Sequence, residues 1–231
     1  MLSQKIDTSA YGAKKTIDHV SKIRKKENQL YLSEKKFFLK AINSSSTFLD
    51  LGCATGNFIQ IIQSKTKIKD YLGIDTSNNM IDKAKLKYPN FRFLHYNGKL
   101  LSVKKKFDLS FCFGTLEYCN NYESLIKQML NLTNKFLIFD MRLTFKPSII
   151  NKKKSYQIIP RSDGRTLPYN IVNFYNFIKF LLKINKFNHS LNLFGYEHKP
   201  AKSITTIYKK VTMTSILIDK TKKFELKIEL K

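Results

Sequence analysis

The stretch FLDLGCATGNF, residues 48–58, decides the fold of this chain. It opens with apolar residues around Asp50, reaches two glycines spaced four apart, Gly52 and Gly56, and continues into the apolar segment 57–63. This order predicts a buried strand, a tight turn and the N-terminus of a helix. The glycines let the backbone approach a ligand closely, and the following helix N-terminus favours an anionic group.

A second apolar run, residues 72–75, ends in an acid, Asp75. An acid at this distance after a glycine loop can accept hydrogen bonds from the two hydroxyls of a ribose held by that loop. The two stretches together therefore predict a pocket for a ligand that contains a ribose.

Strands and helices are expected to alternate along the first two thirds of the chain. The expected strands are 47–51, 71–74, 91–95, 107–113 and 136–139, and the expected helices are 57–63, 77–88 (with Thr76 or Ser77 as N-cap) and 122–132. This alternation predicts an α/β fold with a doubly wound, mostly parallel sheet. Three later apolar stretches, 191–196, 211–218 and 224–230, predict an antiparallel C-terminal edge, with 220–223 as a hairpin turn.

The composition divides the chain into an arm and one main domain. Residues 1–45 are expected to form an N-terminal helical cap or arm, and residues 46–231 the ligand-binding domain. The alternation breaks at about 142–170, which is rich in turn formers and predicts a substrate-binding insertion. The amphipathic segment 171–184 is too short and too polar to span a bilayer, although its lysines leave peripheral membrane contact open.

The formal net charge of +25 over 231 residues suggests an anionic partner such as nucleic acid. Only five of the 42 basic residues are arginine, however, and a lysine-rich chain is also what an AT-biased genome encodes. Nucleic-acid binding therefore stays open without being favoured. The three cysteines have no paired metal-ligand spacing, so we expect neither a disulfide framework nor a metal site. So few cysteines are typical of a reducing compartment, and we expect a cytoplasmic location.

The spacing of the glycine loop tests two common nucleotide sites. A P-loop requires Lys and then Ser or Thr after its second glycine, and Asn57 and Phe58 stand there. A dinucleotide fingerprint requires glycines where this chain has Ala54 and Asn57. Both kinds of site are therefore disfavoured. Without a dinucleotide site, a nicotinamide oxidoreductase is disfavoured as well.

Residues 49–58 closely resemble the first motif of class I S-adenosylmethionine-dependent methyltransferases, and residues 73–75 resemble the second. The resemblance runs from about residue 30 to 140. It implies a Rossmann-like, seven-stranded, mostly parallel sheet with an antiparallel C-terminal edge strand, and S-adenosyl-L-methionine as the cofactor. Ala54 replaces a glycine that the family often varies, and Asn97 stands where the family usually has an Asp that meets the adenine.

The cofactor residues implied by this resemblance come from four strand ends. Asp75 binds the ribose, and the exit of the fourth expected strand flanks the methionine half. The expected set is Asp50, Gly52, Cys53, Ala54, Gly56, Asn57, Asp75, Thr76, Asn97, Gly98, Phe113 and Gly114.

Methyl transfer is an in-line displacement in which the protein mainly orients the reactants and excludes water. A general base helps when the acceptor is a hydroxyl or an amine. Glu117, His189 and His198 are candidates for the base, and Tyr118 is a candidate positioning group. Glu117 follows the fourth expected strand, at the edge where doubly wound sheets bind ligands.

The acceptor is expected to be a small anionic molecule, methylated on oxygen or nitrogen. Arg142, Arg161 and Arg165 fall close together in a chain that otherwise uses lysine, and arginine binds carboxylates and phosphates through two parallel hydrogen bonds. An RNA-directed methyltransferase and a non-catalytic cofactor-binding or RNA-binding module remain alternatives.

Overall fold

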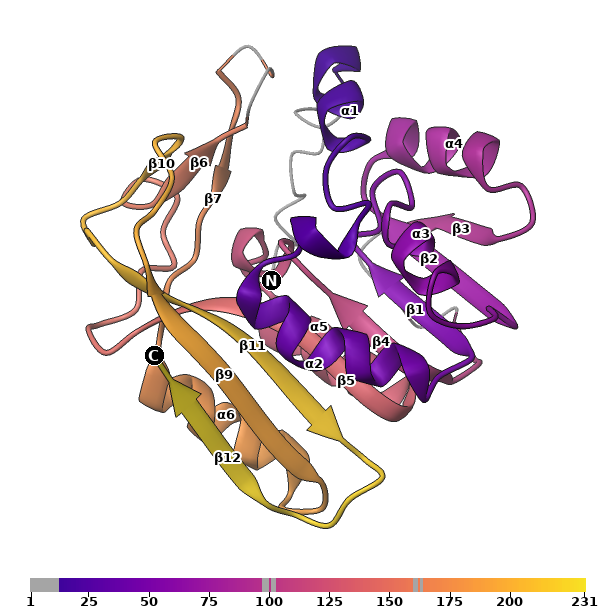
Figure 1. The fold of residues 1–231 in the computed structure, drawn as a ribbon. Helices are drawn as coiled ribbons and strands as arrows, with labels where there is room; N and C mark the ends of the chain where they lie inside the picture. The colour runs from indigo at the N-terminus through magenta and orange to yellow at the C-terminus, as the bar shows by residue number, and fades with distance from the viewer. Residues whose placement is uncertain (1–12, 97–99, 101–102, 160–161, 163) are drawn as a thin grey trace.

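The computed structural model describes residues 13–96, 100, 103–159, 162 and 164–231. The strand predicted before the glycine loop, β1 (Thr47–Leu51), lies inside one large sheet (Figure 1). The strand order in that sheet is β12-β9-β11-β5-β4-β1-β2-β3, and the two-residue β8 pairs with β5. The other strands of the sheet are β2 (Asp70–Asp75), β3 (Arg92–His95), β4 (Phe107–Cys112), β5 (Thr133–Thr144), β8 (Val172–Asn173), β9 (Ser190–His198), β11 (Val211–Asp219) and β12 (Leu226–Leu230).

The predicted mixture of strand directions is confirmed. β3, β2, β1, β4 and β5 are parallel neighbours, whereas β11 is antiparallel to both β5 and β9. Over the described residues the sheet has nine strands where the resemblance implied seven. The additions are β12, which extends the edge beyond β9, and the short β8.

The prediction that the last two strands form a hairpin is wrong. β12 does not pair with β11 but lies parallel to β9, with Leu226 opposite Leu191. The connection passes across the beginning of β9, where the Leu191 amide donates to the Glu225 carbonyl at 2.8 Å. The chain therefore skips one strand before it rejoins the sheet.

Helices cover both faces of the sheet, as a doubly wound fold requires, because successive strand side chains point to opposite faces. Phe48 joins the core beneath α2, α3 and α4, and its neighbour Leu49 joins the core beneath α5 and α6. These helices are α2 (Leu32–Asn43), α3 (Phe58–Gln63), α4 (Asn78–Lys87), α5 (Tyr122–Asn131) and α6 (Phe174–Asn185). Of the helices in the described ranges, none is long and apolar enough to cross a membrane.

Side-chain caps set where two of these helices begin. The Ser77 hydroxyl accepts from the Met80 amide at 3.4 Å, as predicted for α4. Asn173 accepts from the Asn176 amide at 3.1 Å, so α6 begins at Phe174 rather than at Ile171. The preceding residues are extended and pair with β5 and with Ile149.

The carboxyl ends of β1, β2, β4 and β5 meet at one edge of the sheet. Two further parts of the chain lie over this edge (Figure 1). One is the N-terminal segment with α1 (Lys14–Val20) and a short 3₁₀ turn, η2 (Glu27–Gln29). The other is a small sheet formed by β6 (Tyr156–Ile158), β7 (Thr166–Pro168) and β10 (Ile204–Thr205).

Candidate functional site

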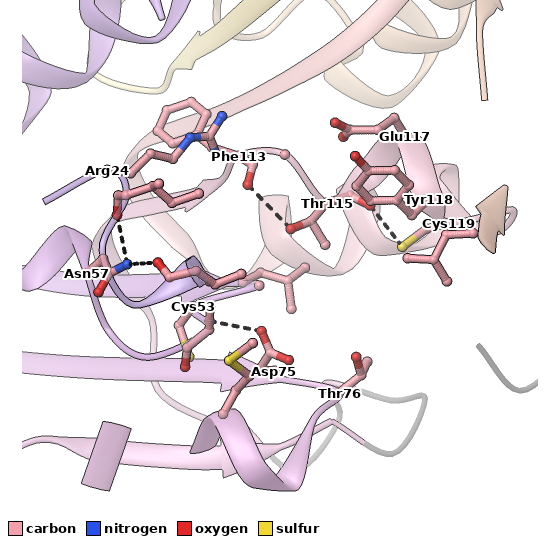
Figure 2. Close-up of a pocket in the computed structure, with 18 of the residues that line it drawn as sticks. Arg24, Cys53, Asn57, Asp75, Thr76, Phe113, Thr115, Glu117, Tyr118 and Cys119 are labelled. Carbon is pink, nitrogen blue, oxygen red and sulfur yellow. Dashed lines mark hydrogen bonds between the residues drawn. The ribbon is translucent and has the colours of Figure 1, made fainter. Parts of the chain in front are cut away.

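A cavity of about 410 Å³ opens where these segments meet the carboxyl ends of the strands (Figure 2). Its size is in the range of small-molecule sites. Its wall combines the N-terminal segment, the glycine loop, the ends of β2 and β4, one residue of β5 and the small sheet. The lining residues include Val20, Ile23, Arg24, Gly52, Cys53, Ala54, Asn57, Asp75, Thr76, Phe113, Gly114, Thr115, Glu117, Tyr118, Arg142, Gln157, Ile159 and Leu167.

The glycine loop turns sharply through left-handed backbone conformations. Gly52 has a φ of +83° and Ala54 a φ of +47°. The Gly52 amide donates to the Ile74 carbonyl at 2.7 Å, which fastens the loop to β2. A Cβ on Gly52 would lie 2.1 Å from Oγ1 of Thr115, so the Gly52 backbone packs directly against the Thr115 side chain at the exit of β4. Glycine is required here both by conformation and by space.

Asp75 ends β2 with its carboxylate at the cavity wall. One oxygen accepts from the Ala54 amide and the other from the Ser77 amide, both at 2.9 Å. A carboxylate has about four lone-pair sites, so Asp75 can also accept from a ligand. Burial raises the pKa of this carboxyl, and the backbone amides of Ser77, Ala54 and Thr76 oppose the rise. Gly73 lets β2 pack closely against the glycine loop, since a Cβ at this position would lie 2.8 Å from Sγ of Cys53.

Two residues of the expected cofactor set lie beneath the loop rather than on the cavity wall. Asp50 is fully enclosed and accepts a hydrogen bond from the Tyr71 hydroxyl at 2.6 Å. Burial raises the pKa of Asp50 to about 7, partly offset by that hydrogen bond. Gly56 is packed beside the Tyr88 ring. Both residues support the loop from below.

Asn57 lines the cavity and also holds the N-terminal segment in place. Its side-chain amide donates to the carbonyls of Val20 at 2.7 Å and Ile23 at 2.8 Å. Its side-chain oxygen accepts from the Thr55 hydroxyl at 3.1 Å. One side chain therefore connects the glycine loop to the segment that covers it.

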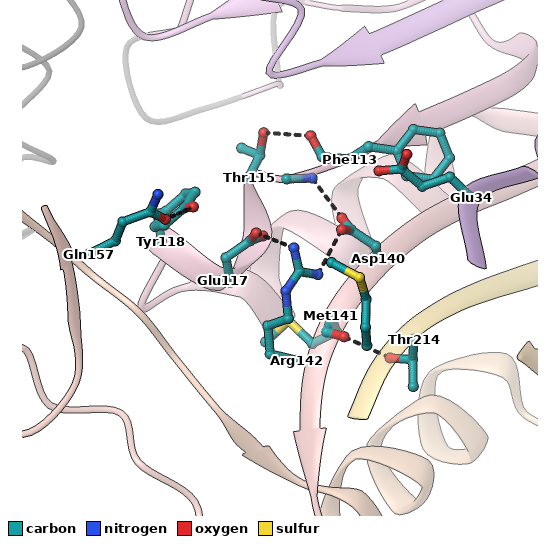
Figure 3. A network of polar contacts seen from close by, with 12 residues as sticks. Glu34, Phe113, Thr115, Glu117, Tyr118, Asp140, Met141, Arg142, Gln157 and Thr214 are labelled. Atoms are coloured by element: carbon teal, nitrogen blue, oxygen red, sulfur yellow. Dashed lines mark hydrogen bonds and ion pairs between the residues drawn. The ribbon is translucent and has the colours of Figure 1, made fainter. Parts of the chain in front are cut away.

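A buried charge network follows the exit of β4 (Figure 3). The Gly114 amide donates to Asp140 at 2.7 Å, and Arg142 joins Asp140 at 2.8 Å to Glu117 at 2.9 Å. Burial raises the pKa of Glu117 to about 7, with Arg142 opposing the rise. The second carboxylate oxygen of Glu117, Oε2, is buried and has no hydrogen-bond partner among the described residues.

Of the three arginines predicted to bind an anionic acceptor, the structure describes Arg142 and Arg165 and does not bring these two together at the cavity. Arg142 reaches the cavity, but it lies on β5, which continues to Thr144 rather than ending before an insertion, and its charge is held by two carboxylates. Arg165 is exposed and stands away from the cavity wall. Arg161 lies outside the described residues. Among the described residues of that segment, the geometry thus gives the anionic-acceptor hypothesis no available arginine, and the call on Arg161 stays a prediction.

The candidate catalytic residues also separate. Glu117 and Tyr118 lie on the 3₁₀ turn η3 (Leu116–Tyr118) and face the cavity, where the Tyr118 hydroxyl donates to Gln157. His189 precedes β9 at the opposite end of the sheet, because its neighbour Ser190 pairs with Asp219, which pairs with Phe136 at the beginning of β5. His198 ends β9 and is not part of the cavity wall. Asn97 and Gly98 lie outside the described residues.

Sequence reasoning missed Arg24. Its guanidinium lies 2.7 Å from the Glu34 carboxylate, and a Cβ on Gly114 would lie 2.8 Å from its Nη1. The residue reaches the exit of β4 only because the N-terminal segment folds back over the sheet. The signal that could have found it is the choice of arginine itself, which is rare in this chain.

The methyltransferase domain family, described as "Methyltransferase domain", matches residues 48–135, which run from β1 to the beginning of β5 and include the glycine loop, Asp75 and the exit of β4. Over these residues the chain is similar to methyltransferase domains. The match covers the carboxyl ends of β1, β2 and β4 that line the cavity and leaves out the N-terminal segment and the small sheet.

Two curated relatives match part of the chain. The putative methyltransferase 235L of Invertebrate iridescent virus 6 is 30% identical over 115 residues, 49% of this chain and 43% of that protein. The trans-aconitate 2-methyltransferase of Enterobacter sp. (strain 638) is 24% identical over 92 residues, 40% of this chain and 36% of that protein. The chain thus aligns with less than half of the length of either relative.

Solved structures show that the fold extends over most of the chain. An S-adenosylmethionine-dependent methyltransferase from Clostridium acetobutylicum superposes with a TM-score of 0.58 at 16% identity, covering 89% of this chain and 98% of that one. The N-terminal domain of EvdMO1, solved with S-adenosylhomocysteine (SAH) bound, gives a TM-score of 0.57 at 11% identity, covering 92% of this chain and 84% of that one. These likenesses establish the fold.

Proposed function

We propose that this protein transfers a methyl group from S-adenosyl-L-methionine to a small-molecule acceptor. The observation that carries the proposal is Asp75, a half-buried carboxylate at the end of β2 that lies beside the glycine loop on the cavity wall and can accept hydrogen bonds from a ligand. That arrangement suits a ribose with two vicinal hydroxyls. The names of the curated relatives support methyl transfer, and the Clostridium acetobutylicum methyltransferase and the SAH bound to EvdMO1 support the same cofactor.

The cavity offers a place for each part of this cofactor. Asp75 and Thr76 would hold the ribose, and the bare backbone at Gly52 and Gly114 would lie along the methionine half. Arg24 is the cation nearest that half, because it lies beside Gly114, and its planar guanidinium suits a carboxylate. Asp50 and Gly56 would act indirectly by supporting the loop, and Asn57 by closing the cover over it.

The cofactor supplies an activated methyl carbon, and the protein supplies position and a dry environment. Orientation of the two reactants can contribute about 7–11 kcal/mol toward the barrier. The N-terminal segment and the small sheet would exclude water from opposite sides, and the small sheet would form the acceptor wall through Gln157, Ile159 and Leu167. Glu117 is the group placed to take a proton from the acceptor, with Tyr118 beside it.

Calorimetric titration with S-adenosylmethionine and SAH tests the cofactor assignment. Replacing Asp75 by Ala removes two charge-assisted hydrogen bonds, each contributing about 1.5–3 kcal/mol, so we expect affinity to fall at least about 100-fold. The matched control is Asp82→Asn, an exposed acid on α4, which should bind as the parent does. A parent protein that binds neither ligand would refute the proposal. Binding without turnover of any acceptor would instead favour the non-catalytic module.

A further inference from the structure

The acceptor end of the cavity contains one unused polar atom of well-defined chemistry. Glu117 is 1% exposed, and its Oε1 accepts from Arg142 at 2.9 Å. Its Oε2 is buried without a hydrogen-bond partner among the described residues, although the side chain belongs to the cavity wall. A buried carboxylate oxygen without a donor is costly, and a ligand that donates there removes the cost.

The charge balance around this atom favours a cation over an anion. The network contains the carboxyls of Glu34, Asp140 and Glu117 but only the guanidiniums of Arg24 and Arg142. Arg142 is bonded to two carboxylates, so an anionic ligand would meet carboxyl groups and, among the described residues at this end, no available guanidinium. A positively charged or proton-donating ligand would complete the network.

The neighbouring wall is apolar apart from one internally bonded pair. The Tyr118 hydroxyl donates to the Gln157 side chain, and Tyr118 packs with Ile159 and Leu167. These residues fit the hydrocarbon part of a small molecule whose polar group reaches Glu117. The apolar wall and the neighbouring Glu117 carboxyl therefore favour an amphipathic acceptor.

We propose that the methyl acceptor is a small molecule with a primary or secondary amine, whose nitrogen donates to Oε2 of Glu117 before it is methylated. This inference rests on the proposed methyltransferase function and names its acceptor class. The amine binds as an ammonium ion and first gives one proton to Oε2 of Glu117, which frees the lone pair on nitrogen, and Glu117 later releases that proton to solvent. The lone pair then forms the bond to the methyl carbon as the sulfur–methyl bond breaks, the bonding pair stays on sulfur as a thioether, and the methylated product leaves as an ammonium ion.

The test measures SAH release from the parent enzyme with two acceptor panels, small apolar amines and small carboxylic acids that include trans-aconitate. Turnover confined to amines is the expected result. Turnover confined to carboxylic acids would overturn the proposal even if the proposed function held. If the parent protein did not bind SAH, the proposed methyltransferase function itself would be contradicted. The two failures can therefore be told apart.

A substitution then connects the amine to Glu117. Glu117→Gln keeps the bond to Arg142 but cannot take a proton, and we expect kcat/KM for the amine to fall at least about 100-fold, with SAH affinity changed less than about threefold. Glu197→Gln, an exposed glutamate on β9, is the matched control and should leave both unchanged. Equal losses in SAH affinity and turnover would place the cofactor's own ammonium at Glu117 and overturn the assignment.

The pH profile separates proton transfer from a merely structural role. The parent should lose kcat/KM below about pH 7 as Glu117 takes up its proton, and Glu117→Gln should lack that limb while Glu117→Asp retains it. If Glu117→Gln still lost kcat/KM below about pH 7, the titrating group would be a residue other than Glu117, and the proposed proton transfer would be overturned. The other charged or titratable groups that face Glu117 are Arg24, Cys112, Cys119, Asp140, Arg142 and Tyr169.

Discussion

Ala54 adopts a left-handed conformation, with a φ of +47°, inside the loop that carries the proposed cofactor site. A residue with a Cβ is disfavoured in this region, by about 1–2 kcal/mol. The amide of Ala54 nevertheless donates to Asp75, so the strained conformation orients the acid that we assign to the ribose. The loop thus trades some stability for a fixed carboxylate.

Replacing Ala54 by glycine should therefore stabilise the protein. We expect the free energy of unfolding to rise by about 0.5–1 kcal/mol, because the relieved strain exceeds the added freedom of the unfolded chain. Chemical denaturation measures the change. Ala84→Gly, the same substitution inside α4 and in the buried core, should destabilise instead. A decrease for both variants would show that Ala54 is unstrained.

At the scale of elements, a small set of polar contacts holds the N-terminal segment over the cavity. Asn57 binds the carbonyls of Val20 and Ile23, Arg24 pairs with the buried Glu34 of α2, and two ion pairs join Asp18 to Lys83 and Glu27 to Lys65. The last two ion pairs are between exposed side chains and contribute little to stability. The two hydrogen bonds of Asn57 are therefore the main polar attachment of this cover to the glycine loop.

Asn57→Ala should loosen the cover without unfolding the sheet. Loss of two hydrogen bonds at about 0.5–1.5 kcal/mol each predicts faster amide exchange in α1 and weaker SAH binding, by about 5- to 100-fold. Hydrogen exchange and calorimetry together provide the measurement. The control is Asn131→Ala at the exposed end of α5. Unchanged exchange in α1 would mean that other contacts hold the segment.

At the scale of the whole molecule, buried acids impose a pH dependence opposite to ordinary acid denaturation. Burial raises the pKa of Asp50 to about 7, well above its value in an unfolded chain. The folded state therefore binds a proton more tightly than the unfolded state does. The resulting stability is fully present below about pH 4 and is lost as pH rises through about 7.

Comparing the parent with Asp50→Asn isolates this contribution. The free energy of unfolding of the parent, relative to the variant, should fall between pH 5 and pH 8 by an amount on the order of 3 kcal/mol. Denaturant titrations at a series of pH values measure the difference. Parallel curves for the two proteins would show that Asp50 has the same pKa in both states.

The glycine loop, Asp75 and the alternating elements were predictable because their causes are local in the sequence. Glycine spacing, capping residues such as Ser77 and apolar periodicity act within a few neighbouring residues. The parallel core and its antiparallel partner followed from these patterns. The family resemblance added the cofactor.

The rest depends on which distant segments meet. Arg142 looked available for an acceptor because its partner Glu117 lies 25 residues earlier in the sequence. The alternating pattern of β12 fits pairing with β11 or with β9 equally well, so the pattern alone could not exclude the hairpin. Arg24 reaches the site through the fold of the N-terminal segment, and His189 is excluded only by strand direction. Such contacts are set by topology rather than by local pattern.

The buried network of two guanidiniums and three carboxyls also makes ligand capture an acid–base event. With the pKa values of Glu34 and Glu117 raised to about 7 by burial, the empty network holds part of a proton at neutral pH. A cation that enters the cavity displaces that proton into the buffer. The heat of binding then includes the buffer's own heat of protonation, and the protein gives up a hydrogen ion for the charge that it takes in.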